Sequence, residues 1–321
     1  MKNKIIVVVG DPRSINSEII FKSWKTLNKK IKKQIYFVAN YDLIKTQFQK
    51  LKFNQKIKSV NKFDLKENDG DFKIINVPLN FKNPFDISKK EVSKYIKNSF
   101  NLAHILAKQK NVKGLINCPI DKNYISKSRV IGITELLANK CQINDQSEVM
   151  MIYNKKLSVV PITTHINISN ISNKISTKLI VRKISSLNKN YNFLFKKKPK
   201  IAVLGLNPHN GEMKKNSEEK LKIIPALKRL KKMKIRAYGP FVSDTFFIDY
   251  FKNFDVVVGM YHDQVLIPFK SLFHYNAINI TLGLSYIRVS PDHGPAKDII
   301  GKRKANPLSL LECIKFINNL N

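Results

Sequence analysis

Residues 255–270 read Asp-Val-Val-Val-Gly-Met-Tyr-His-Asp-Gln-Val-Leu-Ile-Pro-Phe-Lys, a short apolar run followed at once by polar side chains. The β-branched run at the start is typical of a strand that is buried on both faces of a parallel sheet. Four polar residues, Tyr261 to Gln264, then follow without an amphipathic pattern. Because ligands bind beyond the carboxyl ends of strands in open α/β sheets, His262 is a candidate for chemistry.

The same arrangement occurs twice more along the chain. The apolar run 157–162 leads into Thr163-Thr-His165, and the run 201–206 leads into Asn207-Pro-His-Asn-Gly-Glu212. A single histidine after a strand is usually a loop residue, but three of the six histidines occupy this position. Three neutral imidazoles with an open fourth position form a known catalytic metal site. The pattern therefore favours a divalent metal, and three separate loop histidines are the alternative. The candidate ligands are His165, His209 and His262.

A chain of 321 residues is long for a single core, so two domains are expected. Predicted strands alternate with predicted helices, which indicates an α/β protein with a largely parallel or mixed sheet. A hairpin is expected where two neighbouring strands meet at residues 154–156. The predicted strands are 4–9, 34–39, 114–118, 148–153, 157–162, 201–206, 255–260 and 276–281, and the predicted helices are 17–27, 41–51, a long one opened by the capping box at Ser88, 171–187, 218–232 and 307–318.

The net charge of +35 would fit a nucleic-acid-binding protein. However, only seven of the 58 basic residues are arginines, whose bidentate side chain is the usual reader of bases and phosphates. The lysines are spread along the whole chain. The charge therefore indicates a solvated surface that helps to attract an anionic substrate, and nucleic-acid binding remains the alternative from another class of function.

The sequence also limits the cellular compartment. No apolar run approaches the roughly 20 residues that a membrane helix needs, and the apolar stretch after Met1 is too short for a signal peptide. Cys118, Cys141 and Cys313 are too few and too scattered for a disulfide framework. We expect a cytoplasmic protein with no membrane partner.

Two further groups stand downstream of His262. Lys270, Asn279 and Arg288 are cationic or polar and could bind a phosphate or a carboxylate, although a surface salt bridge would explain them as well. Residues 292–307 form a turn-rich stretch before the last predicted helix, and alone they predict only a loop. The turn after the first strand lacks the Gly-rich dinucleotide fingerprint.

Taken together, these motifs closely resemble those of the 4-hydroxythreonine-4-phosphate dehydrogenase family of pyridoxal phosphate biosynthesis. The match runs nearly from end to end and in order. The stretch 293–307 also resembles the adenosine-binding loop of the isocitrate and isopropylmalate dehydrogenases. The matching residues are Gly10 to Pro12, Cys118 to Lys122, Gly132 to Glu135, Thr163 to His165, Gly205 to Glu212, Gly239-Pro240, Asp244-Thr245, Met260 to Gln264, Asn279 to Gly283, Ile287-Arg288 and Asp292 to Gly294.

The resemblance implies a fold like that of isocitrate and isopropylmalate dehydrogenase, with two α/β domains and the site in the cleft between them. The expected first domain comprises residues 1–136 plus 290–321 and carries the nucleotide-binding loop. The expected second domain, residues 137–289, carries the metal ligands and the dimer interface. The resemblance also implies a homodimer with a shared active site, in which one metal ligand comes from the partner subunit.

The implied reaction is metal-dependent oxidation of 4-phosphooxy-L-threonine by NAD or NADP. The product is a 3-oxo acid that decarboxylates to 3-amino-2-oxopropyl phosphate. The metal, which is Zn, Mg, Co or Mn, would bind the substrate hydroxyl and the neighbouring amine. The implied residues are Thr134, Lys270, Asn279 and Arg288 for the substrate, and His293, Gly294, Asp298 and Asn306 for the cofactor. Our own candidates for proton transfer are Asp244 and Lys270.

The chain departs from the family pattern at three places. The family motif Gly-His-Thr-Glu is Gly-Ile133-Thr-Glu here, so an isoleucine occupies a substrate-binding position that is histidine in the family. Val265 stands where the family has a glycine, and residues 12–17 lack the family's glycines. Because Ile133 leaves the exact substrate open, the sister alternative is the same chemistry on a sugar-acid phosphate such as erythronate or threonate 4-phosphate.

Overall fold

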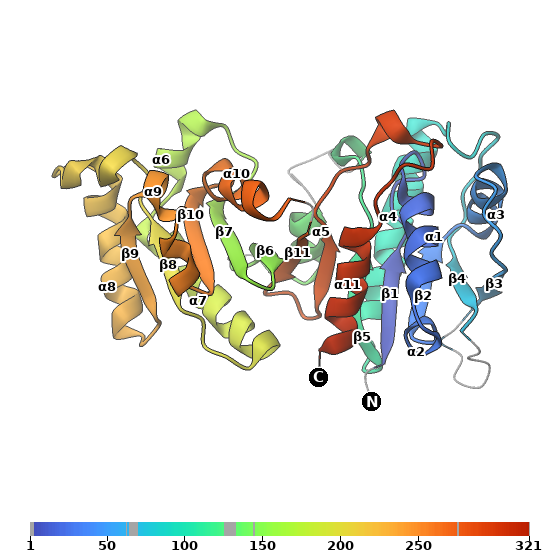
Figure 1. Ribbon diagram of the computed structural model, residues 1–321, viewed down its shortest axis with the longest axis horizontal. Coiled ribbons are helices and arrows are strands. Elements are labelled where there is room, and N and C mark those ends of the chain that lie inside the picture. The colour runs from blue at the N-terminus through green and yellow to red at the C-terminus, as the bar shows by residue number, and fades with distance from the viewer. Residues whose placement is uncertain are drawn as a thin grey trace. The chain divides into compact units, whose positions relative to one another are not determined.

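The computed structural model describes residues 3–61, 63, 70–124, 133–143, 145–274 and 276–320. The chain forms two compact units (Figure 1). The first unit comprises Met1–Lys140 and Ser285–Asn321, and the second comprises Cys141–Leu284. Strands and helices alternate in both units, which confirms the predicted α/β class. Among the helices described, none has the length and apolar character needed to cross a membrane.

The strands of the first unit lie in the order β3-β4-β2-β1-β5-β12, and their pairings are all parallel. Residues 137–140 and 285–289 belong to this unit, whereas the sequence prediction assigned them to the second domain. Strand β12 is held here by its pairing with β5. All residues of β1 and β2 are buried, as expected for the central strands of a parallel sheet. The strands are β1 (Lys4–Val8), β2 (Ile35–Ala39), β3 (Ile57–Val60), β4 (Phe72–Asn76), β5 (Val112–Asn117) and β12 (Arg288–Pro291).

The longest helix of the first unit begins where its capping box predicts. The Ser88 side chain accepts a hydrogen bond from the backbone N–H of Glu91 at 3.4 Å, and α4 buries Val92, Tyr95 and Ile96. The helices of this unit are α1 (Asn16–Thr26), α2 (Lys29–Lys32), α3 (Tyr41–Lys50), α4 (Lys89–Ala107), η1 (Lys122–Tyr124), α5 (Ile133–Lys140), η6 (Lys297–Ile299) and α11 (Leu308–Asn319).

The strands of the second unit lie in the order β11-β6-β7-β10-β8-β9. Strand β6 is antiparallel to both of its neighbours, and the other pairings are parallel. The predicted hairpin is confirmed, because Asn154 pairs with Leu157 and two lysines form the turn. The strands are β6 (Val149–Asn154), β7 (Leu157–Thr163), β8 (Ile201–Leu204), β9 (Ala237–Phe241), β10 (Val256–Tyr261) and β11 (Ile278–Leu282).

Two helix predictions for this unit were wrong in detail. The single helix expected over 171–187 is two helices, because the Ser176 side chain accepts from the Leu179 N–H at 3.1 Å and starts a new helix. The helix expected over 218–232 opens with a π-helical turn, next to Pro225, which has no N–H to donate. The helices are η2 (Ile168–Asn170), α6 (Ile171–Lys174), α7 (Thr177–Phe195), η3 (Pro208–Met213), η4 (Glu219–Ile223), α8 (Ile224–Lys232), α9 (Ser243–Phe246), η5 (Tyr250–Asn253) and α10 (His262–Phe273).

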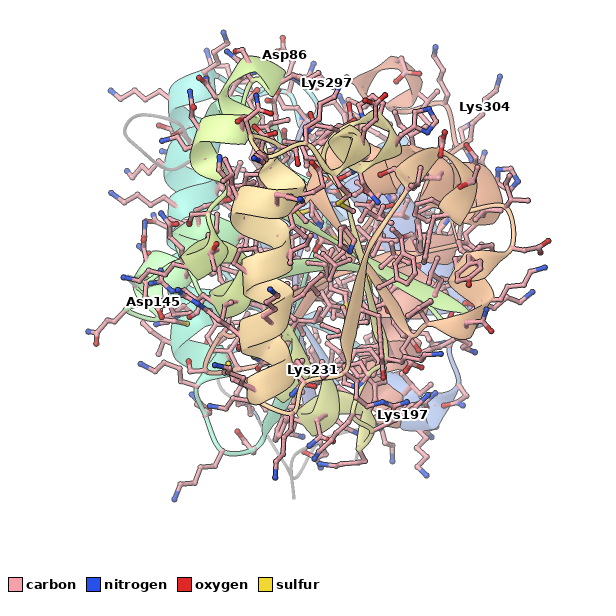
Figure 2. All side chains as sticks on the ribbon, turned by 90° about the vertical axis from the view of Figure 1, so that its left-hand side faces the viewer. Asp86, Asp145, Lys197, Lys231, Lys297 and Lys304 are labelled. Atoms are coloured by element: carbon pink, nitrogen blue, oxygen red, sulfur yellow. The ribbon has the colours of Figure 1, made fainter. Side chains whose placement is uncertain are left out.

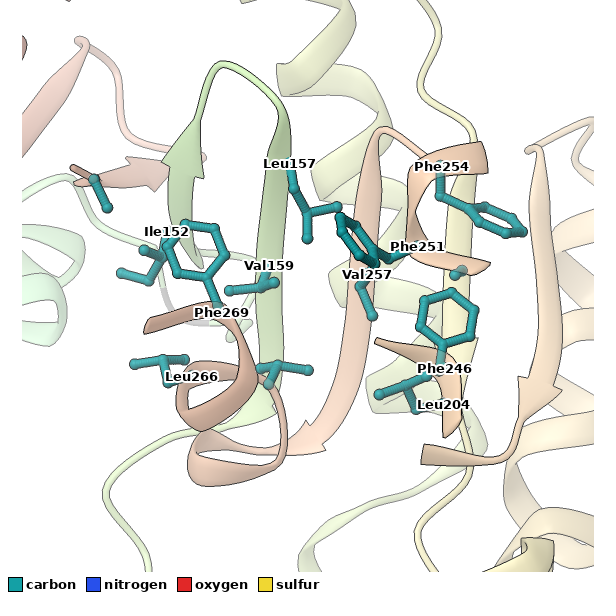
Figure 3. Close-up of a cluster of buried hydrophobic side chains, with 13 residues drawn as sticks. Ile152, Leu157, Val159, Leu204, Phe246, Phe251, Phe254, Val257, Leu266 and Phe269 are labelled. Carbon is teal, nitrogen blue, oxygen red and sulfur yellow. The ribbon is translucent and has the colours of Figure 1, made fainter. Parts of the chain in front are cut away.

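A buried apolar cluster holds four strands of the second unit, β6, β7, β8 and β10, against short helices (Figure 3). Val159, Leu204 and Val257 contribute from β7, β8 and β10, while Phe246 and Phe269 contribute from α9 and α10. Fully burying one such side chain stabilises a fold by about 1.5–3 kcal/mol. The cluster therefore fixes the strands from whose ends the three candidate histidines follow.

The surface carries the lysines that the composition predicts. Lys197, Lys231 and Lys304 are exposed, and Figure 2 shows side chains with nitrogen tips extending outward around the visible outline. Such solvated side chains carry much of the net positive charge.

Candidate metal centre and substrate residues

Two of the three candidate ligands come together at the ends of β7 and β10. These strands pair in parallel up to Thr163 and Tyr261. The Thr163 hydroxyl donates to the carbonyl of Met260 at 2.7 Å and ties the two ends together. As a result, the rings of His165 and His262 lie 5.5 Å apart between centroids.

This spacing fits two ligands of one metal ion. Two imidazoles bound to a tetrahedral ion at about 2.1 Å have their centroids roughly 5 Å apart. Nδ1 of His262 lies 2.6 Å from Oδ1 of Asp263. A carboxylate can only accept, so the ring donates from Nδ1 and leaves Nε2 for a metal, as is common for metal-binding histidines.

His209 lies elsewhere, on η3 beyond β8. Its side chain is exposed and its backbone is left-handed, with φ of 49°. Within the described ranges, no cluster of three or more His, Cys, Asp or Glu side chains could hold a metal. The single chain therefore assembles His165 and His262 and does not bring His209 to them.

Gln264, which the sequence marked only as the last member of the polar run Tyr261 to Gln264, connects three elements around this centre. Its Oε1 accepts from the N–H of Met260 at 2.6 Å, and its Nε2 donates to the carbonyl of Gly205 at 2.6 Å and to the Ser243 hydroxyl at 2.8 Å. A Cβ at Gly259 would lie 2.8 Å from Gln264 Oε1. Only glycine therefore lets α10 turn back so closely after β10.

Glu219 is a second residue that the sequence prediction missed. Its side chain is fully buried, and one carboxylate oxygen accepts from the N–H groups of Leu206 and Asn207, both at 2.8 Å. The sequence Ser-Glu-Glu-Lys around it is typical of an exposed helix start, so its burial could not be read from the chain alone.

The candidate proton-transfer and substrate residues of the second unit occupy three elements. Asp244 is exposed on α9, where its Oδ1 accepts from the Thr245 N–H at 2.7 Å. Lys270 is exposed on α10, about 12 Å along the helix axis from His262. Asn279 lies on β11, and its Oδ1 is buried without a hydrogen-bond partner among the described residues. A buried acceptor of this kind can take a hydrogen bond from a ligand or from water.

The first unit carries the other substrate candidates. Ile133 begins α5 and is only 9% exposed, and Thr134 beside it is half-buried. Arg288 is buried at the start of β12, and its Nε donates to Oδ1 of Asn117 at 2.6 Å. Burial lowers the pKa of Arg288 to about 10, so the guanidinium still carries its charge at neutral pH.

The candidate cofactor residues lie in the loop between β12 and α11. His293 Nδ1 is 3.0 Å from the carbonyl of Gly294, where a Cβ would meet nothing within 4 Å. Asp298 is exposed on η6, and Asn306 Oδ1 accepts from the N–H of Leu308 at 2.9 Å at the start of α11.

Comparison with known proteins identifies the family to which the chain is similar. The profile of the family described as "Pyridoxal phosphate biosynthetic protein PdxA" matches residues 17–317. A 4-hydroxythreonine-4-phosphate dehydrogenase of Aquifex aeolicus is 36% identical over 327 residues, which cover 100% of this chain and 99% of that protein. A protein of Oceanobacillus iheyensis provisionally named D-threonate 4-phosphate dehydrogenase is 33% identical over 96% of this chain and 95% of its own.

Solved structures show the same relationship. The 4-hydroxythreonine-4-phosphate dehydrogenase of Klebsiella pneumoniae matches with a TM-score of 0.85 and 28% identity over 98% of both chains. The isocitrate dehydrogenase of Methylococcus capsulatus matches with a TM-score of 0.51 and 12% identity, over 98% of this chain and 84% of that one. The second match concerns the fold alone, and it confirms the predicted likeness of the fold to that of isocitrate dehydrogenase.

Proposed function

The chain belongs to the family of the pyridoxal phosphate biosynthetic protein PdxA, and from that premise we propose that it oxidises 4-phosphooxy-L-threonine in pyridoxal phosphate biosynthesis. As a dehydrogenase of this family it uses a nicotinamide cofactor, either NAD or NADP. The product is a 3-oxo acid that loses carbon dioxide to give 3-amino-2-oxopropyl phosphate. The observation that carries the proposal is the pairing of His165 with His262, together with Asp263 behind the second ring.

The proposed metal ligands are His165 and His262 of one subunit and the partner's His209. The first two lie together in one chain, while His209 is exposed on a separate loop and so is open to a second copy. A divalent ion held there, Zn, Mg, Co or Mn, would lower the pKa of the substrate hydroxyl and stabilise the negative charge that develops on it. Asp263 keeps His262 in the tautomer that such an ion requires.

A surface for the second copy is suggested by the distribution of apolar side chains. Of the twelve large hydrophobic residues that are exposed in the described parts of the chain, ten belong to the second unit. Ile168, Met213 and Ile267 follow His165, His209 and His262 within five residues. Exposed apolar side chains mark an interaction site where they form a contiguous patch, and an interface between identical chains would place the histidine loops near one another.

The remaining residues bind and orient in this proposal. The buried Arg288, fixed by Asn117, and the exposed Lys270 attract the carboxylate and the phosphate. Asn279 accepts a hydrogen bond through its buried Oδ1, and Thr134 adds a hydroxyl. We assign proton transfer to Asp244 and Lys270. The cofactor's adenosine part is assigned to His293, Gly294, Asp298 and Asn306.

A sugar-acid phosphate is the second candidate substrate. Ile133 can neither donate nor accept a hydrogen bond, and one relative that matches almost the whole chain is named for D-threonate 4-phosphate. The two substrate classes differ in the amine next to the reacting carbon, which the sugar acids replace with a hydroxyl.

A substrate panel tests the proposal. Purified protein is given 4-phosphooxy-L-threonine, D-threonate 4-phosphate or erythronate 4-phosphate with NAD or NADP and a divalent metal, while reduced nicotinamide and carbon dioxide are measured. We expect kcat/KM to be highest on 4-phosphooxy-L-threonine by at least about 10-fold. A preference for either sugar acid would overturn the choice of substrate.

We also propose a cytoplasmic location, with which the three free cysteines agree.

A further inference from the structure

The loop that carries His209 has an unusual backbone. Five consecutive residues, from His209 to Met213, all have positive φ between 49° and 57°. Only one of them, Gly211, is a glycine. Left-handed conformations are unfavourable for residues with a Cβ, so this turn persists only because its surroundings hold it.

The buried carboxylate of Glu219 supplies that support from the N-terminal side of the turn. Oε1 accepts from the backbone N–H groups of Leu206 and Asn207, each at 2.8 Å. Oε2 accepts from the Asn207 side-chain amide at 3.1 Å. One fully buried side chain thus fixes Leu206 and Asn207, which are separated from the left-handed turn only by Pro208.

The same carboxylate is also packed against both glycines of the loop. A Cβ at Gly205 would lie 3.1 Å from Oε1 of Glu219, and a Cβ at Gly211 would lie 3.1 Å from Oε2. A Cβ at Gly211 would also lie 2.9 Å from Cβ of Ser217. The turn is therefore shaped around Glu219 and leaves no room between its backbone and the carboxylate.

The neighbouring Glu218 holds the same loop more weakly. Its Oε2 accepts from the Asn207 amide at 2.8 Å, and its Oε1 accepts from the Ser172 hydroxyl. Unlike Glu219, Glu218 touches no backbone N–H of the loop and is only half-buried. The backbone conformation of the His209 loop therefore depends on Glu219 more than on Glu218.

We propose that Glu219 is a positioning residue, whose buried carboxylate shapes the loop so that His209 can complete a metal site on the partner subunit. This inference rests on the proposed function, because it requires His209 to be a ligand. Glu219 itself touches neither metal nor substrate in this account. It acts through the N–H groups of Leu206 and Asn207.

The test compares Glu219→Ala with Glu219→Gln in the full-length protein. Alanine removes every hydrogen bond that the carboxylate accepts. Glutamine keeps an acceptor for the two backbone N–H groups but turns its own amide donor toward the side-chain amide of Asn207. Asp249→Asn is the matched control, since it removes an exposed carboxylate of the same unit that pairs only with Lys252 among the interactions described. Circular dichroism and thermal unfolding report whether each variant folds.

Two readouts separate positioning from general stability. Hydrogen exchange of peptides that span residues 205–213, measured without added metal, reports the loop itself. Binding of Co²⁺ alone, followed by visible absorption, reports the ligand set. In folded Glu219→Ala we expect exchange in the loop to be at least about 10-fold faster and Co²⁺ affinity to fall by roughly 10- to 100-fold. Glu219→Gln should lie between Glu219→Ala and wild type, and the control should match wild type.

The contrary results are equally specific. Wild-type loop exchange and wild-type Co²⁺ affinity in Glu219→Ala would overturn the inference. If Glu219→Ala fails to fold, Glu219→Gln decides, because unchanged exchange and affinity in that variant would also overturn it. Absence of Co²⁺ binding in the wild-type protein would instead overturn the proposed metal site, while the exchange data would still decide whether Glu219 shapes the loop.

Discussion

Neighbouring residues of one polar motif have different tasks in this protein. Asp263 is exposed and holds Nδ1 of His262, while Gln264 is half-buried and connects the ends of β8 and β10 with α9. The sequence could indicate that Tyr261 to Gln264 matter, because polar residues directly after a buried strand are placed for chemistry. It could not separate the orienting residue from the structural one, because that distinction depends on contacts with Gly205 and Ser243, which are distant in the chain.

Arg288 offers a direct test of anion binding at one residue. Arg288→Lys keeps the charge but loses the Nε bond to Asn117 and the planar shape of the guanidinium. If the residue anchors the substrate, losing a charge-assisted hydrogen bond of about 1.5–3 kcal/mol should lower kcat/KM by roughly 10- to 150-fold. The exposed Arg229→Lys on α8 is the control. Unchanged kinetics in folded Arg288→Lys would remove this residue from the substrate site.

A substitution at Ile133 tests which substrate the protein prefers. Its side chain is nearly buried at the start of α5, while Thr134, Asn279 and Arg288 are all present at the other implied substrate positions. We therefore expect Ile133→His to change kcat/KM on 4-phosphooxy-L-threonine by less than about 5-fold, with Ile133→Leu as the control for packing. A gain of about 10-fold or more would mean that the native substrate differs at the group a histidine would touch.

At the scale of elements, the strands were the most predictable part. β-Branched runs such as those of β1, β7 and β10 predict buried parallel strands. The polar residues that directly follow the runs of β7 and β10 then indicate His165 and His262. The break between α6 and α7 depends on a single serine cap, and the left-handed loop of His209 depends on a carboxylate that tertiary packing buries. Neither feature has a periodic signature in the sequence.

The loop after β12 is fastened to the strand ends of the first unit. Lys297 forms an ion pair with Asp121, and the N–H of Ile15 donates to the carbonyl of Pro295 at 3.2 Å. Burial acts to raise the pKa of Asp121, but the hydrogen bond from Lys297 and the charges of Lys297 and Arg13 outweigh it and hold the pKa below its usual value. The loop that carries the proposed cofactor residues is therefore linked to the ionised form of Asp121.

Asp121→Asn should remove the ion pair with Lys297 and lower the stability of the protein by an amount that depends on pH. A carboxyl group with a depressed folded pKa stabilises the protein above its unfolded pKa of about 3.9, and loses that effect as the pH falls through the folded value. We expect a loss of about 0.2–1 kcal/mol at neutral pH, faster exchange in residues 295–300, and a higher KM for the cofactor. Thermal unfolding from neutral pH to about pH 3 should show the difference from wild type disappearing below about pH 4.

The control for this prediction is Asp86→Asn, an exposed carboxylate of the same unit. It should leave the KM for the cofactor unchanged. An Asp121→Asn variant whose stability deficit persists unchanged at the acid end would contradict the assigned role of the ion pair.

At the scale of the whole molecule, the two units are unlike in their surfaces. The apolar side chains that remain exposed concentrate in Cys141–Leu284, whereas lysines are distributed along the entire chain. Composition alone could predict the charged surface, but not the apolar one, because exposure depends on which face of each element packs inward. This asymmetry supports the proposed homodimer with a shared site.

Mixed dimers test that arrangement. His165 and His262 lie together in one chain, so the informative pair is His209→Ala with His262→Ala. Each variant alone should be inactive, but a mixed dimer has one site with all three ligands, and equal mixing should restore about a quarter of the wild-type activity. Mixing His165→Ala with His262→Ala is the control and should restore none. No recovery in the first mixture after verified subunit exchange would favour a site built within one chain.

The most direct measurement of the central claim follows turnover of 4-phosphooxy-L-threonine and bound metal in the same sample while the metal is removed and returned. Chelation should abolish the formation of reduced nicotinamide in proportion to the metal lost, and Zn, Co, Mn or Mg should restore it. His209→Ala should stay inactive at metal concentrations that saturate the wild-type protein. Full turnover in protein shown by elemental analysis to contain no divalent metal would contradict the account.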